Sequence, residues 1–202
     1  MADHCGLDVK VEARNEGALS DSTLAAAALD DRRQFAHLYE RYADRLYRFA
    51  RARTGSATVA DDIVSDTMLA AMEGLAGFDP QRGTFAGWLF TIARRRMADR
   101  GRKRTRFRRL IERSSHRPTS AQDDMLDDTI RREEAQMVRQ LLDGLSERDR
   151  ELVLLRYSAG LNSTEIADAL GMTSGAVRTR LSRTLQRLAT TLSDREDGEN
   201  IA

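Results

Sequence analysis

The chain has 202 residues, which is enough for one or two domains that each bury an apolar core. Charged residues make up 32% of it, aromatic residues make up 5%, and there are two prolines. This composition disfavours a β-rich architecture and predicts small, highly charged helical domains, so the expected fold class is all-α. Cys5 is the only cysteine, which excludes an intramolecular disulfide and a cysteine-based zinc site.

The sequence contains no apolar run long enough to cross a membrane, and its N-terminus has no signal-peptide core. We therefore expect a cytoplasmic protein. The three histidines are scattered, and the acidic residues show no metal-ligand spacing. No metal site and no cofactor are expected.

The formal net charge of +1 hides a strong segregation of charge along the sequence. Between residues 94 and 117 there are twelve lysines and arginines and only two acidic residues. Between residues 123 and 134 six acidic residues oppose two arginines, and residues 194–199 are also acidic. A charge run is most often a solvated surface. This basic run, however, follows an apolar helix and has the size of a nucleic-acid-binding patch.

We divide the chain into five segments. Residues 1–30 are polar apart from an alanine run, and we expect them to be mostly disordered, with at most one helical turn. The remaining segments are, in order, a helical domain at 31–112, a flexible linker at 113–128, a second helical domain at 129–192 and an acidic tail at 193–202.

Three helices are expected in the first domain. Apolar residues recur at helical spacing over 33–53 and again over 59–75, with Gly55 between the two helices. The segment GFDPQRGT (77–84) contains a proline and two glycines, which predicts a loop. A third helix begins at Phe85 and runs directly into the basic stretch.

The second domain is predicted to begin with a helix whose apolar positions are Ile130, Met137, Leu141 and Leu142. A further helix opens at Ser146, with Asp149 at its third position to complete a capping arrangement.

Residues 162–188 have the pattern of a helix-turn-helix. Asn162 and Glu165 predict a capping box at the start of the first helix, Gly171 a left-handed residue after it, and Thr173 a cap for the second helix. The buried side of the second helix is predicted to be Val177, Leu181, Leu185 and Leu188. Its outer side carries Ser174, Arg178, Arg180, Ser182, Arg183, Gln186 and Arg187, which suits a DNA major groove. An ordinary helical hairpin with a solvated basic face is the alternative.

Four stretches of the chain resemble, in order and spacing, the extracytoplasmic-function (ECF) sigma factors of bacterial RNA polymerase. They are ADDIVSDTM (60–68), FDPQRGTFAGWLFTIARRRMADR (78–100), LSERDRELVLLRY (145–157) and the helix-turn-helix. The resemblance covers about 35–110 and 130–190. It implies a chain that binds core RNA polymerase and directs initiation by recognising the −10 and −35 elements of promoter DNA.

The first of these stretches resembles the helix that binds the polymerase clamp. The candidate polymerase-binding residues are Asp61, Asp62, Ser65 and Asp66. The three aspartates fall near one helix face, which suits a basic protein surface. The alternative is a solvated face whose acids lie near the helix N-terminus, where the helix dipole favours them.

The second stretch resembles the loop and helix that melt and read the −10 element. Residues implied to line the pocket for an extruded base are Asp79, Gln81, Arg82, Gly83 and Thr84. Phosphate contacts are assigned to Arg94, Arg95, Arg96 and Arg100 on the following helix. Many relatives have asparagine where Arg95 stands, which puts the family's usual −10 base contact in doubt. Phe78 and Phe85 can stack on bases or anchor the loop, whereas Trp88 lies on the apolar stripe and is predicted to be core.

The helix-turn-helix resembles the reader of the −35 element. Its candidate DNA-binding residues are Thr173, Ser174, Arg178, Arg180, Ser182, Arg183 and Arg187. Arg178 and Arg183 lie on the outer face, where arginine can pair with guanine edges or with phosphates. Thr173 and Ser174 lie at the helix N-terminus, which suits backbone phosphates.

Two other functions are weighed against a sigma factor. The first is a helix-turn-helix regulator that acts outside the polymerase, for which the basic, loop-bearing first domain has no evident use. The second is an enzyme, which would need a clustered catalytic site that the scattered histidines and acids do not provide. The resemblance also implies an anti-sigma factor as a partner.

Overall fold

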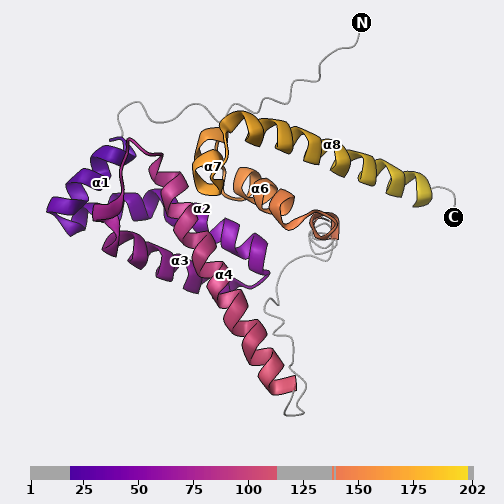
Figure 1. Cartoon of the computed structure of the whole chain (residues 1–202), viewed down its shortest axis with the longest axis horizontal. Coiled ribbons are helices and arrows are strands. Elements are labelled where there is room, and N and C mark those ends of the chain that lie inside the picture. The colour runs from indigo at the N-terminus through magenta and orange to yellow at the C-terminus, as the bar shows by residue number, and fades with distance from the viewer. Residues whose placement is uncertain (1–18, 113–137, 139, 200–202) are drawn as a thin grey trace, which may run out of the picture.

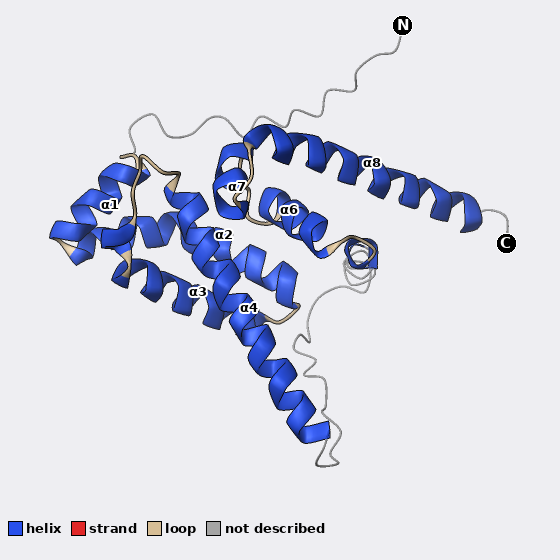
Figure 2. Ribbon diagram, viewed as in Figure 1, coloured by secondary structure: helices blue, strands red, loops and turns tan. Residues whose placement is uncertain are grey.

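The computed structural model describes residues 19–112, 138 and 140–199 (Figure 1). In these residues the regular secondary structure is entirely helical, which confirms the all-α class (Figure 2). The first domain comprises α1 (Asp21–Asp30), α2 (Phe35–Thr54), α3 (Ala57–Glu73) and α4 (Phe85–Glu112), with 3-10 turns at Arg32–Gln34 and Leu75–Gly77. The second comprises α6 (Glu147–Tyr157), α7 (Ser163–Leu170) and α8 (Ser174–Glu199), and residues 140–143 are also helical.

None of the described helices is both long and apolar enough to cross a membrane. Ile130, Met137 and the predicted linker at 113–128 lie outside the described residues, so the predicted domain boundaries in this part of the chain stay predictions.

The core of the first domain is built by the apolar faces of α2, α3 and α4. Its largest fully buried side chains are Leu38, Tyr42, Leu46, Phe49, Ile63, Phe85, Leu89 and Phe90. Gly55 ends α2 in the left-handed conformation, with φ of 73° and its amide bonded to the carbonyl of Arg51, as its position between two apolar helices predicts. Ser56 then caps α3 through the amide of Val59. Caps at both helix ends set the short turn that brings α3 back against α2.

The N-terminal segment is more ordered than the sequence predicted. Residues 21–30 form the helix α1 instead of a mostly disordered stretch, whereas residues 1–18 lie outside the described part of the chain. The alanine run has high helix propensity, Ser20 caps the helix, and Leu24 and two of the alanines are buried. Asp21 adds an ion pair with Arg41 and accepts a hydrogen bond from the hydroxyl of Tyr42. Tertiary packing therefore stabilises a helix too short to persist alone.

The helix-turn-helix has the predicted local geometry. Asn162 and Glu165 form a complete capping box, and Gly171 has φ of 64°, in the left-handed region. The hydroxyl of Thr173 accepts a hydrogen bond from the amide of Ala176 and so caps α8. The predicted cap at Ser146 is also present, because its hydroxyl accepts from the amide of Asp149.

The buried side of α8 differs from the prediction, and Leu181 and Leu188 are only half-buried. Val177 is fully buried, but Leu185 is 36% exposed and Thr184 is fully buried in its place. Seven residues along a helix return to within about 20° of the starting direction, whereas eight overshoot it by about 80°. Thr184 therefore continues the line of Val177, and its hydroxyl is satisfied by the carbonyl of Arg180.

The two domains pack directly against each other. Figure 1 shows α6 and α7 lying beside α2 and the first half of α4, with α8 outermost, and α4 and α7 make the most extensive contact between the domains. The buried apolar residues of both domains belong to one contiguous cluster. The two domains therefore share one core, although the chain separates them by a long intervening segment.

Candidate nucleic-acid interface

The predicted acidic face of α3 is exposed, as expected. Ile63 and Met68 are buried on the opposite side of the helix. Asp61, Asp62, Ser65 and Asp66 are all exposed. Arg100 of α4 donates to Asp62 and to Asp66, each at 2.9 Å, and these hydrogen bonds raise the pKa of its guanidinium. A residue predicted to contact DNA thus bridges two residues predicted to contact polymerase.

The loop before α4 is organised by its own polar groups. The carboxylate of Asp79 accepts from the amide of Gln81 at 2.9 Å, and the carbonyl of Asp79 accepts from the amide of Arg82 at 3.0 Å. Asp79, Gln81 and Arg82 are exposed. The hydrogen bond of the Asp79 side chain therefore stabilises the conformation of the loop. The side chains of Gln81 and Arg82 are exposed to solvent.

Three aromatic residues pack against one another where this loop meets α4. Phe85 lies 5.4 Å from Phe78 and 5.5 Å from Trp88 between ring centroids, and Phe78 lies 5.5 Å from Trp88. Phe85 is buried, whereas Phe78 and Trp88 are half-buried. The cluster anchors the loop to the core, so Trp88 is only partly the core residue that the sequence predicted.

The three consecutive arginines near the middle of α4 fall into two groups. Arg95 and Arg96 are exposed and form no hydrogen bond or ion pair with any described residue. Arg94 is turned toward the second domain, where its guanidinium binds Glu151 in bidentate fashion at 2.8 and 3.0 Å and donates to the carbonyl of Ala169. The structure therefore leaves Arg95 and Arg96 free for a ligand and gives Arg94 a partner within the chain.

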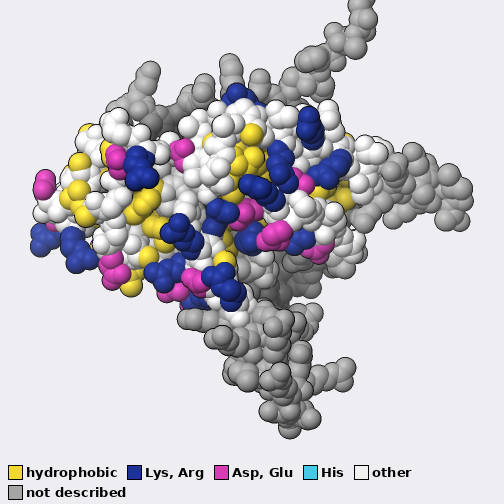
Figure 3. Space-filling model, in the orientation of Figure 1, with side chains coloured by type: hydrophobic (Ala, Val, Ile, Leu, Met, Phe, Trp, Pro, Cys, Tyr) yellow, Lys and Arg dark blue, Asp and Glu magenta, His cyan; other side chains and the backbone are white. Residues whose placement is uncertain are grey.

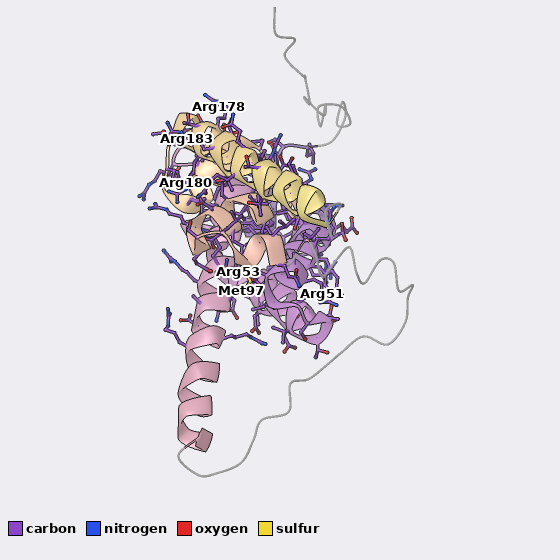
Figure 4. The ribbon with its side chains drawn as sticks, turned by 90° about the vertical axis from the view of Figure 1, so that its right-hand side faces the viewer. Arg51, Arg53, Met97, Arg178, Arg180 and Arg183 are labelled. Carbon is purple, nitrogen blue, oxygen red and sulfur yellow. The ribbon has the colours of Figure 1, made fainter. Side chains whose placement is uncertain are left out.

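The arginines of α8 divide in the same way. Arg178 and Arg183 are exposed and have no hydrogen-bond partner among the described residues. Arg180 and Arg187 both donate to Asp149 of α6, at 2.6 and 2.7 Å. Figure 4 shows Arg178, Arg180 and Arg183 at the α8 end of the molecule, away from Arg53 and Met97 of the first domain.

Asp149 is the centre of this second group. Its side chain is only 7% exposed, and it also accepts a hydrogen bond from the hydroxyl of Ser146 at 2.7 Å. Burial raises the pKa of the Asp149 carboxyl, but the Ser146 hydroxyl and the two guanidiniums outweigh burial and hold this pKa well below its ordinary value. The ionised carboxylate thus fixes two arginines on one side of α8.

Positive and negative side chains intermingle over the surface drawn in Figure 3 instead of forming one basic face. Part of the reason lies between the domains, where α2 and α4 supply arginines and α6 and α7 supply carboxylates. Arg45 donates to the carbonyls of Ala159 and Gly160 at 2.9 and 3.0 Å and pairs with Glu165 at 3.4 Å.

A pocket of about 560 Å³ lies at the junction of the loop, α1 and α7. Its lining includes Gln81, Arg82 and Thr84 from the loop, together with Asp21 and Asp168. Of the predicted loop residues, Gly83 also lines it. Asp79, the fifth residue predicted to surround a base, does not line this pocket, which is bordered by two carboxylates from outside the loop.

Sequence reasoning did not identify Arg45, Arg53, Glu151 or Asp168, all of which connect the two domains. The only local signal was at Glu151, an acidic residue that falls among the buried positions of α6. Burial of an acid predicts a cationic partner, but its identity depends on how the domains dock. Among the described residues, no group of three or more His, Cys, Asp or Glu side chains is placed to hold a metal ion.

Comparison with known proteins identifies the family. Residues 38–107 match the family model of sigma-70 region 2, and residues 135–188 match that of sigma-70 region 4. The chain is 30% identical over 186 residues to the ECF RNA polymerase sigma factor SigD of Mycobacterium tuberculosis, an alignment that covers 90% of this chain and 88% of SigD. The chain belongs to the ECF sigma factors of bacterial RNA polymerase.

A second ECF sigma factor and two solved structures are also similar to the chain. BldN of Streptomyces coelicolor is 32% identical over 163 residues, which are 79% of this chain and 61% of the length of BldN. The solved structure of CnrH in complex with the cytosolic domain of CnrY matches with a TM-score of 0.64 and 30% identity, over 86% of this chain and 97% of that one. RpoE, solved in complex with the anti-sigma factor NepR from Bartonella quintana, matches with a TM-score of 0.56 and 27% identity, over 79% and 96% of the two chains.

As an ECF sigma factor, the protein is a subunit that binds core RNA polymerase and directs initiation at promoters. Both DNA-binding regions of the family are present in the chain, in the order that the sequence predicted. A helix-turn-helix regulator that acts outside the polymerase is not favoured, because the region 2 match accounts for the first domain.

Proposed function

We propose that Arg178 and Arg183 carry the base-edge recognition of the −35 element, and that Arg180 and Arg187 hold the recognition helix in position. The observation behind this division is the ion pairing of the second pair with buried Asp149, while the first pair is exposed. Arginine has five N–H donors, so Arg180 and Arg187 keep donors for DNA phosphates. Thr173, Ser174 and Ser182 supply further contacts at the same surface.

The experiment is run-off transcription with core polymerase on a promoter library. Arg178→Ala and Arg183→Ala are expected to relax the sequence preference at individual −35 positions, since each guanine contact is worth about 1–3 kcal/mol. Arg48→Ala, which removes an exposed arginine paired with Asp44 on α2, is the matched control and should leave the preference unchanged. An unchanged −35 preference in both α8 variants would contradict the assignment.

For the −10 element we propose that the exposed loop residues and the free α4 arginines act together. Gln81 and Arg82, with Asp79, Gly83 and Thr84, surround the extruded base, and Arg95 and Arg96 bind the adjacent phosphates. Arg94 and Arg100 join them only after leaving their present carboxylate partners. The exposure of Arg95 and Arg96 on the helix that follows the loop supports this proposal.

We further propose that Asp61, Asp62, Ser65 and Asp66 form the polymerase contact, because they give α3 an exposed acidic face. Asp61→Arg is the sharpest variant, since Asp61, unlike Asp62 and Asp66, is not bridged by Arg100. It is expected to weaken binding to core polymerase at least about tenfold, as reversal of an interface charge does. Glu73→Arg at the end of the same helix is the control. Equal affinities for both variants would overturn the assignment.

We infer that the protein works in the cytoplasm, without catalysis of its own and without a cofactor, and that an anti-sigma factor holds it inactive. Two of the similar structures are complexes, CnrH with CnrY and RpoE with the anti-sigma factor NepR, which supports such a partner. Affinity purification of the chain from its own host should recover one protein that abolishes run-off transcription when added back. Full activity in the uninduced host would contradict this proposal.

A further inference from the structure

Arg100 lies where the acidic face of α3 meets the basic stretch of α4. Met97 is buried, whereas none of the side chains at 98–102 is, so Arg100 lies about one turn beyond the core. The helices α3 and α4 pack against each other (Figure 1). Across this contact, one terminal nitrogen of the Arg100 guanidinium donates to Asp62 and the other donates to Asp66, each at 2.9 Å. One arginine of α4 therefore pairs with two carboxylates of α3.

This pairing changes the charge of the acidic face. Asp62 and Asp66 are four residues apart on α3, so their carboxylates are neighbours on one side of the helix and repel each other. The guanidinium of Arg100 relieves this repulsion and neutralises part of the negative charge. A basic protein surface that approaches α3 therefore has to compete with Arg100 for the two carboxylates.

The same pairing interrupts the basic surface of α4. Arg96 lies four residues before Arg100, on the same side of the helix and about 6 Å away along its axis. Arg96 is exposed and makes no hydrogen bond or ion pair with a described residue. Both terminal nitrogens of Arg100, in contrast, are bound to carboxylates whose negative charge repels an approaching phosphate. Arg96 can therefore bind a phosphate at once, whereas Arg100 first has to leave α3.

The two ion pairs are of a kind that a partner can replace. The side chains of Arg100, Asp62 and Asp66 are 38%, 54% and 47% exposed. Ion pairs that are this accessible to water contribute little each and are screened by salt. Their exchange for a cation of another protein, or for a phosphate, therefore needs no rearrangement of the core.

We propose that Arg100 couples the two binding steps of this sigma factor, because Asp62 and Asp66 hold it in the free chain and polymerase releases it for DNA by binding these carboxylates. This inference rests on the proposed polymerase contact of α3 and on the proposed phosphate contacts of α4. A basic group of polymerase pairs with Asp62 or Asp66 and displaces the guanidinium, which then turns to a phosphate beside Arg96. Arg100 is thus a positioning residue for polymerase binding and a ligand for DNA.

The coupling has a thermodynamic signature. Polymerase binding raises the affinity for −10 DNA, and −10 DNA raises the affinity for polymerase by the same factor. In the free chain Arg100 competes with polymerase, so its removal should strengthen polymerase binding and weaken DNA binding. A residue that served only the fold, or only DNA, would not produce these opposite effects.

The test measures the affinity of the fluorescently labelled full chain for core polymerase, with and without a saturating single strand that carries the −10 sequence selected by run-off transcription. Without the strand, Arg100→Ala is expected to bind polymerase about threefold more tightly, since two exposed ion pairs no longer compete. The gain in affinity caused by the strand should fall to about one third. Arg100→Lys, which lacks the fork that bridges two carboxylates, should lie between wild type and Arg100→Ala.

Arg96→Ala is the matched control, because it removes the same charge from the same side of α4 without freeing a carboxylate. It should bind polymerase like the wild type when the strand is absent. In a chain that carries both Asp62→Asn and Asp66→Asn, Arg100→Ala should have no further effect on polymerase binding. Unchanged or weaker polymerase binding by Arg100→Ala alone would overturn the coupling, and so would an equal gain in Arg96→Ala or a further gain in the double asparagine variant.

Two other results would strike the proposed function, and the coupling with it. Wild-type affinity of the double asparagine variant for polymerase would refute the polymerase contact of Asp62 and Asp66. Wild-type affinity of the polymerase complexes of both Arg96→Ala and Arg100→Ala for the strand would refute the phosphate contacts of α4. Circular dichroism confirms that each variant is folded.

Discussion

Asp149 shows how a single buried carboxylate organises the recognition helix. Its replacement by alanine removes the charge-assisted hydrogen bonds from Arg180, Arg187 and Ser146. Both arginines can turn to solvent, so we expect a loss of about 2 kcal/mol in the free energy of unfolding of region 4. Urea denaturation measures this loss. Asp143→Ala, which breaks an exposed pair with Arg150, should cost less than about 0.5 kcal/mol, and an equal cost for both variants would contradict the argument.

The same residue predicts a dependence of stability on pH. The pKa of Asp149 in the folded protein lies below its ordinary value of 3.8, so the unfolded chain binds this proton more readily. Its contribution is therefore complete above about pH 4 and is lost as the pH falls further towards the folded-state pKa. Urea midpoints between pH 5 and pH 2.5 should fall less steeply for Asp149→Asn than for the wild type. Parallel curves would show that the ion pairs contribute nothing.

At the scale of the elements, the turn of the helix-turn-helix depends on one backbone conformation. Gly171 has φ of 64°, and an L-residue with a β-carbon pays about 1–2 kcal/mol there. Gly171→Ala should therefore lower the free energy of unfolding of region 4 by about 1 kcal/mol. Gly101→Ala, in an exposed helical position with open space around it, should raise stability by about 0.5–1 kcal/mol. Two changes of the same sign in denaturation experiments would contradict this reasoning.

Several helix boundaries are set by local capping hydrogen bonds. Ser56, Ser146, Asn162 and Thr173 begin helices by capping amides two or three residues ahead. Such signals are contained within a few residues, and for that reason the helix-turn-helix and the cap at Ser146 were predictable. The helix α1 was not, because its stability comes from burial of Leu24 and from the contacts of Asp21 with α2.

At the scale of the whole molecule, the interface between the regions is rich in ion pairs, which predicts sensitivity to salt. Raising the salt concentration from about 0.05 M to about 1 M shortens the screening length to about 3 Å and should increase the radius of gyration of the wild type. Gly87→Ala should change much less, because its added β-carbon would lie 2.3 Å from the β-carbon of Asp168 and disrupt the interface in advance. X-ray scattering of both proteins over this range measures the effect. Equal salt dependence would show that Arg45, Arg53 and Arg94 do not hold the interface closed.

The sequence alone determined the all-α class, the loop before α4, the acidic face of α3 and the helix-turn-helix. Each of these depends on residues within about two helical turns, where apolar period and capping chemistry are decisive. The tertiary structure alone decided which arginines are free. Arg180 and Arg187 meet Asp149 across 31 and 38 residues, and Thr84 meets Asp168 across 84. Contacts at such separations depend on how complete helices and domains dock, and no local pattern of charge or hydrophobicity records that.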